Sequence, residues 1–144
     1  MHVEVGYNSR LDELQAAALR VLLPELAGWT RARRAAACAY ERAGIRELVD
    51  VQRETEGASS AYHLYVVRTR ARDALSDALR QAGVETRAYY TTPLNRQPAL
   101  VDGGSPEPLP NSENLASEGL ALPMGQSLDE AAVSRVVDAI RALR

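Results

Sequence analysis

The stretch AYHLYVVRTRARDALSDALRQAG, residues 61–83, decides the fold because it joins a strand pattern directly to a helix pattern. Residues 61–69 are rich in Tyr, Val and Thr and contain no Gly or Pro, which is typical of a β-strand. Residues 70–83 form a helical pattern that ends at Gly83. The next segment, VETRAYYT at 84–91, predicts another strand. The middle of the chain is therefore expected to hold two strands separated by a helix.

The N-terminal part predicts two helices. The first begins near Leu11, with Asn8 or Ser9 as its cap, and Pro24 breaks or kinks it. The second runs from about Pro24 or Leu26 to Ala43, with Gly44 as its stop. Its basic side is expected to be a solvated face, formed by Arg31, Arg33, Arg34 and Arg42. Both helices are long for so small a sheet, and we expect them to pack against something outside this chain.

The C-terminal part begins with a loop rich in Gly and Pro at 101–110. It continues with a short helix at 111–120, an extended segment at 121–124, and an amphipathic helix that Ser127 caps and Glu130 completes as a capping box. Few strands among several helices predict an α+β fold, with a small antiparallel sheet flanked by helices.

The composition limits the classes of protein to which this chain can belong. A chain of 144 residues with 46% hydrophobic residues suits one domain with its own core. The net charge of −2 gives no broad field to attract nucleic acid or an anionic membrane. The single cysteine, Cys38, cannot form an internal disulfide and is expected to be a small packed residue. Without an apolar run of about 18 residues or a signal peptide pattern, a soluble cytoplasmic protein is expected.

All 17 basic residues are arginine, and the chain contains no lysine. Because arginine stays protonated in proteins, this chain by itself has no side-chain amine that could form a Schiff base. His2 and His63 are the only histidines, so no metal site is expected, and no nucleophile motif or phosphate-binding glycine loop is present.

Two groups of polar residues remain as binding candidates. His63 and Tyr65 share one face of a strand, and if Leu64 faces the core, they line an open face. The alternative is a half-exposed strand with no binding role. The second group lies near a loop bounded by proline, as a binding rim or merely a turn: Tyr89, Tyr90, Asn95 and Arg96.

Four stretches of the chain, taken in order, resemble the C-terminal part of the DegT/StrS-type sugar aminotransferases, which are fold-type I enzymes. The stretches are GYNSRLDELQAAALR, AYHLYVVRTRARDALSDALRQAGVETRAYY, TPLNRQPAL and SENLASEGLALPM. The resemblance covers nearly the whole chain. It implies the small C-terminal domain of that fold at residues 46–144, with connecting helices at 1–45.

The same resemblance implies what this chain lacks. In the family, a large N-terminal domain carries the lysine that binds pyridoxal phosphate (PLP), together with the groups that hold the PLP ring. No catalytic residue is therefore expected here, in agreement with the absence of lysine. The expected partners are a PLP-binding large domain or a full-length homologue, in a homo- or hetero-oligomer.

The resemblance also implies roles for individual residues. Asn8 matches the asparagine of the GxNxR motif, which binds the PLP phosphate across a dimer interface. Arg10 matches the arginine of that motif, either as added charge near the phosphate or as a structural brace of the turn. His63, Tyr65 and Tyr89 become candidates for the nucleotide-sugar pocket. Here the chain departs from the family pattern, which often has His at the positions of Tyr89 and Asn95 and sometimes at Ser60, and Pro at Thr91. Asn95 can accept and donate hydrogen bonds, but it cannot act as an acid or base near neutral pH.

The function that the resemblance implies is amino transfer from glutamate or glutamine to a keto-sugar, by a longer protein of which this chain is the C-terminal part. The alternative is a free-standing, non-catalytic homologue that binds a partner subunit.

Overall fold

The computed structural model describes residues 6, 11–100 and 108–143. Its elements, in chain order, are α1 (Glu13–Leu22), η1 (Leu23–Glu25), α2 (Leu26–Arg42), η2 (Ile45–Glu47), β1 (Asp50–Val51), β2 (Tyr65–Arg68), α3 (Arg72–Gln81), η3 (Leu94–Arg96), η4 (Pro98–Leu100), α4 (Pro110–Glu118), β3 (Gly119–Leu122) and α5 (Glu130–Arg141). Within these described parts, no helix is long and apolar enough to span a membrane.

The three strands form one antiparallel sheet in the order β1-β2-β3, so the predicted α+β class with a small antiparallel sheet is confirmed. In the pairing of β2 with β3, Tyr65 lies opposite Leu122 and Val67 lies opposite Leu120. Because side chains alternate along a strand, these four residues face one side of the sheet, and all four are buried.

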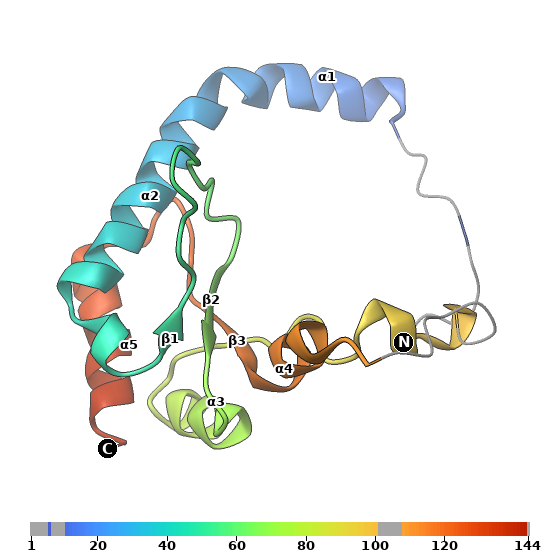
Figure 1. Ribbon diagram of the computed structural model, residues 1–144. Helices are drawn as coiled ribbons and strands as arrows, with labels where there is room; N and C mark the ends of the chain where they lie inside the picture. The colour runs from blue at the N-terminus through green and yellow to red at the C-terminus, as the bar shows by residue number, and fades with distance from the viewer. Residues whose placement is uncertain (1–5, 7–10, 101–107, 144) are drawn as a thin grey trace.

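Helices α2, α3 and α5 cover that buried side of the sheet (Figure 1). Small residues at Ala36, Ala37 and Ala39 let α2 approach α5 closely. The apolar residues of α5 recur at helical spacing and are buried against the sheet: Val133, Val136, Val137 and Ile140. One core therefore lies between a single layer of helices and one face of the sheet.

The caps of two helices differ from the predicted ones. Asp12, rather than Asn8 or Ser9, caps α1, because its side chain accepts a hydrogen bond of 2.7 Å from the backbone N–H of Gln15. Asp129 caps α5 in the same way through Ala132, at 2.7 Å, so the expected cap at Ser127 is wrong. In both cases an aspartate close to the first turn replaces the predicted hydroxyl or amide cap.

The helix stops and the proline break are confirmed. Pro24 lies in the 3-10 turn η1, which joins α1 to α2 without an extended linker. Gly44 follows the C-cap of α2 with φ of 85°, a left-handed conformation that glycine adopts without steric cost. Gly83 ends α3 in the same way, with φ of 76°.

The strand predictions need three corrections. The strand expected at 61–69 is only Tyr65–Arg68. The segment 84–91 is not a strand and makes only an isolated bridge, from Arg87 to Ala121. The two-residue strand β1 was not predicted, because Asp50 and Val51 are too few to show an alternation.

Helix α1 extends away from the sheet and contributes no buried residue to the described part of the chain (Figure 1). Its apolar stripe is open to solvent, with Leu14 exposed by 84% and Val21 by 76%. Cys38 is exposed rather than packed, because it lies on the side of α2 away from the buried alanines.

Candidate functional site

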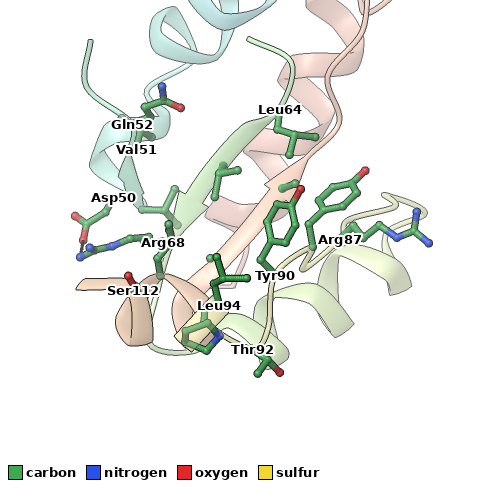
Figure 2. Close-up of a pocket in the computed structure, with 18 of the residues that line it drawn as sticks. Asp50, Val51, Gln52, Leu64, Arg68, Arg87, Tyr90, Thr92, Leu94 and Ser112 are labelled. Atoms are coloured by element: carbon green, nitrogen blue, oxygen red, sulfur yellow. Dashed lines mark ion pairs between the residues drawn. The ribbon is translucent and has the colours of Figure 1, made fainter. Parts of the chain in front are cut away.

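The open face of the sheet, opposite the helices, forms a cavity of about 1020 Å³. Residues Leu64, Val66 and Ala121 line its floor, because they alternate with the core residues of β2 and β3. The loop after α3 and helix α4 supply further walls, through Leu94 and Ala116. Figure 2 shows Leu64, Leu94 and the Tyr90 ring along this cavity. An apolar floor with a polar rim is the usual composition of a ligand pocket.

Arginines dominate the polar rim of this cavity. Arg68, at the end of β2, lies 3.6 Å from the Asp50 carboxylate and 3.7 Å from Glu118. The guanidinium of Arg87 lies 5.6 Å from the centre of the Tyr89 ring, a cation–π arrangement. Arg87 has no carboxylate partner among the residues that the structure describes, which leaves positive charge at this end of the cavity.

The loop at 92–97 is held by its own hydrogen bonds. The Gln97 amide nitrogen donates to the backbone carbonyl of Thr92 at 3.1 Å, and the Gln97 side chain is almost fully buried. Arg96 forms an ion pair of 2.8 Å with Glu113, which ties the loop to α4. The Oδ1 atom of Asn95 is buried and accepts no hydrogen bond from any described residue. A donor from a ligand or another chain would satisfy this oxygen.

The structure does not bring the four predicted substrate residues together. Tyr89 lines the cavity and is half exposed. Asn95 lies in η3, beside two residues that line the cavity, Leu94 and Gln97. His63 is exposed on the loop before β2, and it does not line the cavity.

Tyr65 faces the opposite way from the expectation. It is only 3% exposed, and its ring stacks on Tyr40 of α2 at 4.6 Å between centroids. Its hydroxyl lies 3.3 Å from the Glu41 carboxylate. Burial, with the Glu41 charge as the second cause, raises the pKa of the Tyr65 phenol well above its ordinary value. The expected orientation is wrong because Leu64, not Tyr65, faces the open side of the sheet.

Asn8 and Arg10, the residues predicted to contact the PLP phosphate, lie outside the described residues. Their roles stay predictions. In the part of the chain that is described, no group of three or more His, Cys, Asp and Glu residues is placed to hold a metal ion.

Sequence reasoning missed Arg87 and Gln97 as wall residues of the cavity, and it missed two arginines of α2. Arg33 and Arg34 lie on the side of α2 that is predicted to be a solvated face, yet both donate hydrogen bonds to backbone carbonyls of the loop before β2. No signal in the sequence separates them from Arg31, which is exposed on the same helix.

Comparison with known proteins places this geometry in a family. The model of the DegT/DnrJ/EryC1/StrS aminotransferase family matches residues 1–141. The chain is 41% identical over 143 residues to a pleiotropic regulatory protein of Geobacillus stearothermophilus. This match covers 96% of this chain and 38% of the regulatory protein. It is 37% identical over 143 residues to a dTDP-3-amino-3,4,6-trideoxy-alpha-D-glucose transaminase of Streptomyces venezuelae. This match covers 97% of this chain and 38% of the transaminase.

A solved structure agrees with this assignment. The crystal structure of S. venezuelae DesV in complex with a ketimine intermediate matches with a TM-score of 0.87 and 36% identity, over 96% of this chain and 38% of the DesV chain. The chain thus spans about 38% of the length of these curated relatives.

Proposed function

Because this chain belongs to the DegT/DnrJ/EryC1/StrS aminotransferase family, we propose that it is the C-terminal part of a PLP-dependent nucleotide-sugar aminotransferase. One observation carries the proposal: the family match runs over residues 1–141, yet the chain spans only 38% of the length of the transaminase relative. The part of that relative which this chain does not match is where the catalytic machinery of such an enzyme would lie. The complete protein would transfer an amino group to a keto-sugar bound to a nucleotide.

PLP, when bound in such an enzyme, supplies an electron sink and an aldehyde that condenses with a lysine amine. The residues present here do not fit that role, because all 17 basic residues are arginines. We therefore assign no catalytic step to this chain. Its proposed contribution to the cofactor is limited to hydrogen bonds from Asn8 and Arg10 to the phosphate group, as the GxNxR motif implies.

The chain's own contribution to the substrate is a wall of the nucleotide-sugar pocket. The cavity on the open face of the sheet offers an apolar floor, the half-exposed ring of Tyr89 and the positive charge of Arg87. A cation beside an aromatic ring suits a ligand that carries both a phosphate and a base. The buried, unpaired oxygen of Asn95 would accept a hydrogen bond from a hydroxyl or amine that the complete site brings near.

The proposed partner of α1 is the lysine-bearing large domain. Leucine and valine side chains line α1 and the turn after it, and none of these side chains is buried in the described part of the chain. An exposed apolar stripe of this kind is typical of a surface that another domain covers. The large domain, whether in the same polypeptide or in a partner, would then form the other side of the pocket.

A domain exchange tests this proposal. The C-terminal part of S. venezuelae DesV that matches this chain is replaced by residues 1–141, and the hybrid is purified with PLP. We expect the hybrid to bind PLP, with its visible absorption, and to convert keto-sugar nucleotides to amino sugars. A folded, PLP-loaded hybrid that transfers no amino group to any of a panel of dTDP- and UDP-linked keto-sugars would contradict the proposal.

A second experiment addresses the absence of lysine. The 144-residue chain alone is mixed with PLP and reduced with borohydride, and the product is mapped by mass spectrometry. We expect no pyridoxyl group on any side chain. A stoichiometric adduct at one site other than the N-terminal amine would show that the chain anchors the cofactor by itself.

The alternative is a free-standing, non-catalytic homologue that binds a partner subunit, and the exposed apolar stripe of α1 is a surface that such a partner would cover. Size-exclusion chromatography with light scattering separates the two cases. A discrete dimer or hetero-complex of the chain supports an independent subunit, whereas concentration-dependent aggregation supports a part of a longer enzyme.

A further inference from the structure

A second, smaller cavity adjoins the cavity on the open face of the sheet. Its volume is about 550 Å³, and it is lined by α3, by the segment 85–89 and by the chain around the end of β3. Four residues line both cavities: Leu64, Arg87, Tyr89 and Ala121. Arg87 and Tyr89 are the polar ones among them, so they form the junction between the two cavities. Figure 2 shows Arg87 at the end of the larger cavity opposite to Arg68 and Asp50.

Arg87 is fixed at this junction by its backbone, and its charge is available. Its N–H donates to the Ala121 carbonyl at 3.1 Å, and its carbonyl accepts from the Ala121 N–H at 2.8 Å. The guanidinium lies over the Tyr89 ring and forms no hydrogen bond or ion pair with any described residue. Packing over a ring leaves the N–H donors at the edge of the guanidinium free to bind a phosphate group.

The other arginines of the two cavities are less suited to an anion that reaches both. Three of them are paired with carboxylates of this chain: Arg46, Arg68 and Arg80. Arg53 has no such partner among the described residues, but it follows β1, at the border of the sheet opposite to β3, and lines only the larger cavity. Of the described residues, Arg87 is therefore the free cation that both cavities share.

The smaller cavity also holds a pair of hydroxyl groups. The side-chain oxygens of Ser76 and Thr86 lie 3.0 Å apart, and both residues line the cavity. Because one hydroxyl donates to the other, the pair keeps one free O–H donor and free acceptor lone pairs. The pairing edge of a nucleobase carries a donor next to an acceptor and matches this combination. Glu85, a carboxylate of the same lining, disfavours a phosphate inside this cavity, so the uncharged base is the part that fits there.

We propose that the nucleoside diphosphate of the substrate crosses this junction, with its phosphates on Arg87 and its base in the smaller cavity against Ser76 and Thr86. The inference rests on the proposed function and names the part of the nucleotide-sugar that this chain binds. The sugar then lies in the larger cavity. The rim of that cavity carries the exposed side chains of Tyr90 and Leu94, which another domain can cover.

Binding of dTDP to the 144-residue chain tests the inference without PLP, sugar or a large domain. An NMR titration is expected to shift the amide signals of Thr86 and Arg87. Arg87→Gln should weaken dTDP binding about tenfold, since it removes a charge-assisted contact. Arg31→Gln is the matched control, because Arg31 is exposed on α2 and lines neither cavity. No saturable binding of dTDP, or equal losses in the two variants, would overturn the inference.

The placement of the base needs a second variant and a second probe. Thr86→Val removes the hydroxyl and keeps the size of the side chain, and it should weaken dTDP about fivefold without changing the binding of inorganic pyrophosphate. Arg87→Gln should weaken both probes. A silent Thr86→Val would overturn the placement of the base.

Arg53→Gln tests the rival position for the phosphates, at the opposite border of the sheet. It should leave the affinity for dTDP unchanged, and a loss in Arg53→Gln larger than that in Arg87→Gln would overturn the inference. The proposed function fails on a different result, which is an unmodified DesV hybrid that transfers no amino group.

Discussion

At the scale of single residues, the pair of Tyr40 and Tyr65 shows what the sequence could and could not predict. The alternation along β2 correctly separates two faces of the strand. It does not say which face is buried, because both carry tyrosine or branched apolar residues. Tyr40, 25 positions earlier, determines which face is buried. Its ring stacks on Tyr65, and its hydroxyl donates a hydrogen bond of 2.8 Å to the Pro123 carbonyl. Such a contact between distant elements leaves no local pattern.

This tyrosine pair predicts a loss of stability at high pH. Burial raises the pKa of both phenols, Tyr40 and Tyr65, above the ordinary value of 10.0. Both groups therefore bind their protons more tightly in the folded than in the unfolded chain. Their contribution to stability is complete below pH about 10 and is lost progressively as the pH rises above it.

The measurement is the free energy of unfolding in urea at pH 8, 9, 10 and 11. We expect it to be level up to pH about 10 and to fall beyond it. The variant Tyr65→Phe should be flatter over the same range, because one of the two phenols is gone. An unchanged slope in that variant would show that other groups cause the loss.

At the scale of elements, helices were predicted well and strands poorly. The helices have apolar residues at a clear spacing and end at glycines, such as Gly44 and Gly83, whose positive φ explains the stop. The strands are short, so few residues carry their signal. The segment 84–91 has the composition of a strand, but only Arg87 pairs with β3.

The cap of α5 gives a prediction at this scale. Asp129→Ala removes the side-chain acceptor of the Ala132 N–H and should lower the free energy of unfolding by about 1 kcal/mol. Ser127→Ala is the control and should change it by less than about 0.5 kcal/mol. Urea unfolding curves of both variants provide the comparison. A larger effect from Ser127 would restore the cap that the sequence pattern predicted.

Two glycines of the same helix region give a matched pair. Gly44→Ala forces a side chain into a left-handed conformation and is expected to cost about 1 kcal/mol, since its Cβ meets only ordinary contacts. Gly28→Ala, inside α2, should instead stabilise by up to about 1 kcal/mol, since its Cβ would meet only an ordinary contact of 3.8 Å with Arg31 Nη2. Thermal unfolding followed by circular dichroism will show the two shifts, and shifts of the same sign would contradict this explanation.

At the scale of the whole molecule, the resemblance to the aminotransferases predicted the family, the α+β class and the partial length. The division at residue 45 into connecting helices and small domain stays a prediction, although α2 contributes Tyr40 and three alanines to the core. The cavity could not be predicted, because it forms where a sheet face, a loop and α4 meet. The expectation that the first two helices pack outside the chain fits the exposed stripe of α1, but it is wrong for α2, which packs against α5 in the core.

That stripe gives the prediction at this scale. Replacing Leu14 and Val21 by Gln should leave the free energy of unfolding within about 0.5 kcal/mol of the original, because both side chains are already exposed. The same change should weaken self-association or binding to a large domain, as measured by light scattering over a range of concentrations. Ala17→Gln, also exposed on α1, is the control. A marked loss of stability would mean that the stripe packs within this chain.

The two borders of the small sheet have a consequence for how this polypeptide behaves at high concentration. One border of the sheet is β1, with two residues, and the other is β3, where the bridge from Arg87 already pairs with Ala121. Among the residues that the structure describes, neither border offers a long row of free backbone groups, so we expect fibril growth by strand addition to be disfavoured. Precipitates of this protein should accordingly be amorphous and helix-rich, without the cross-β signal of amyloid.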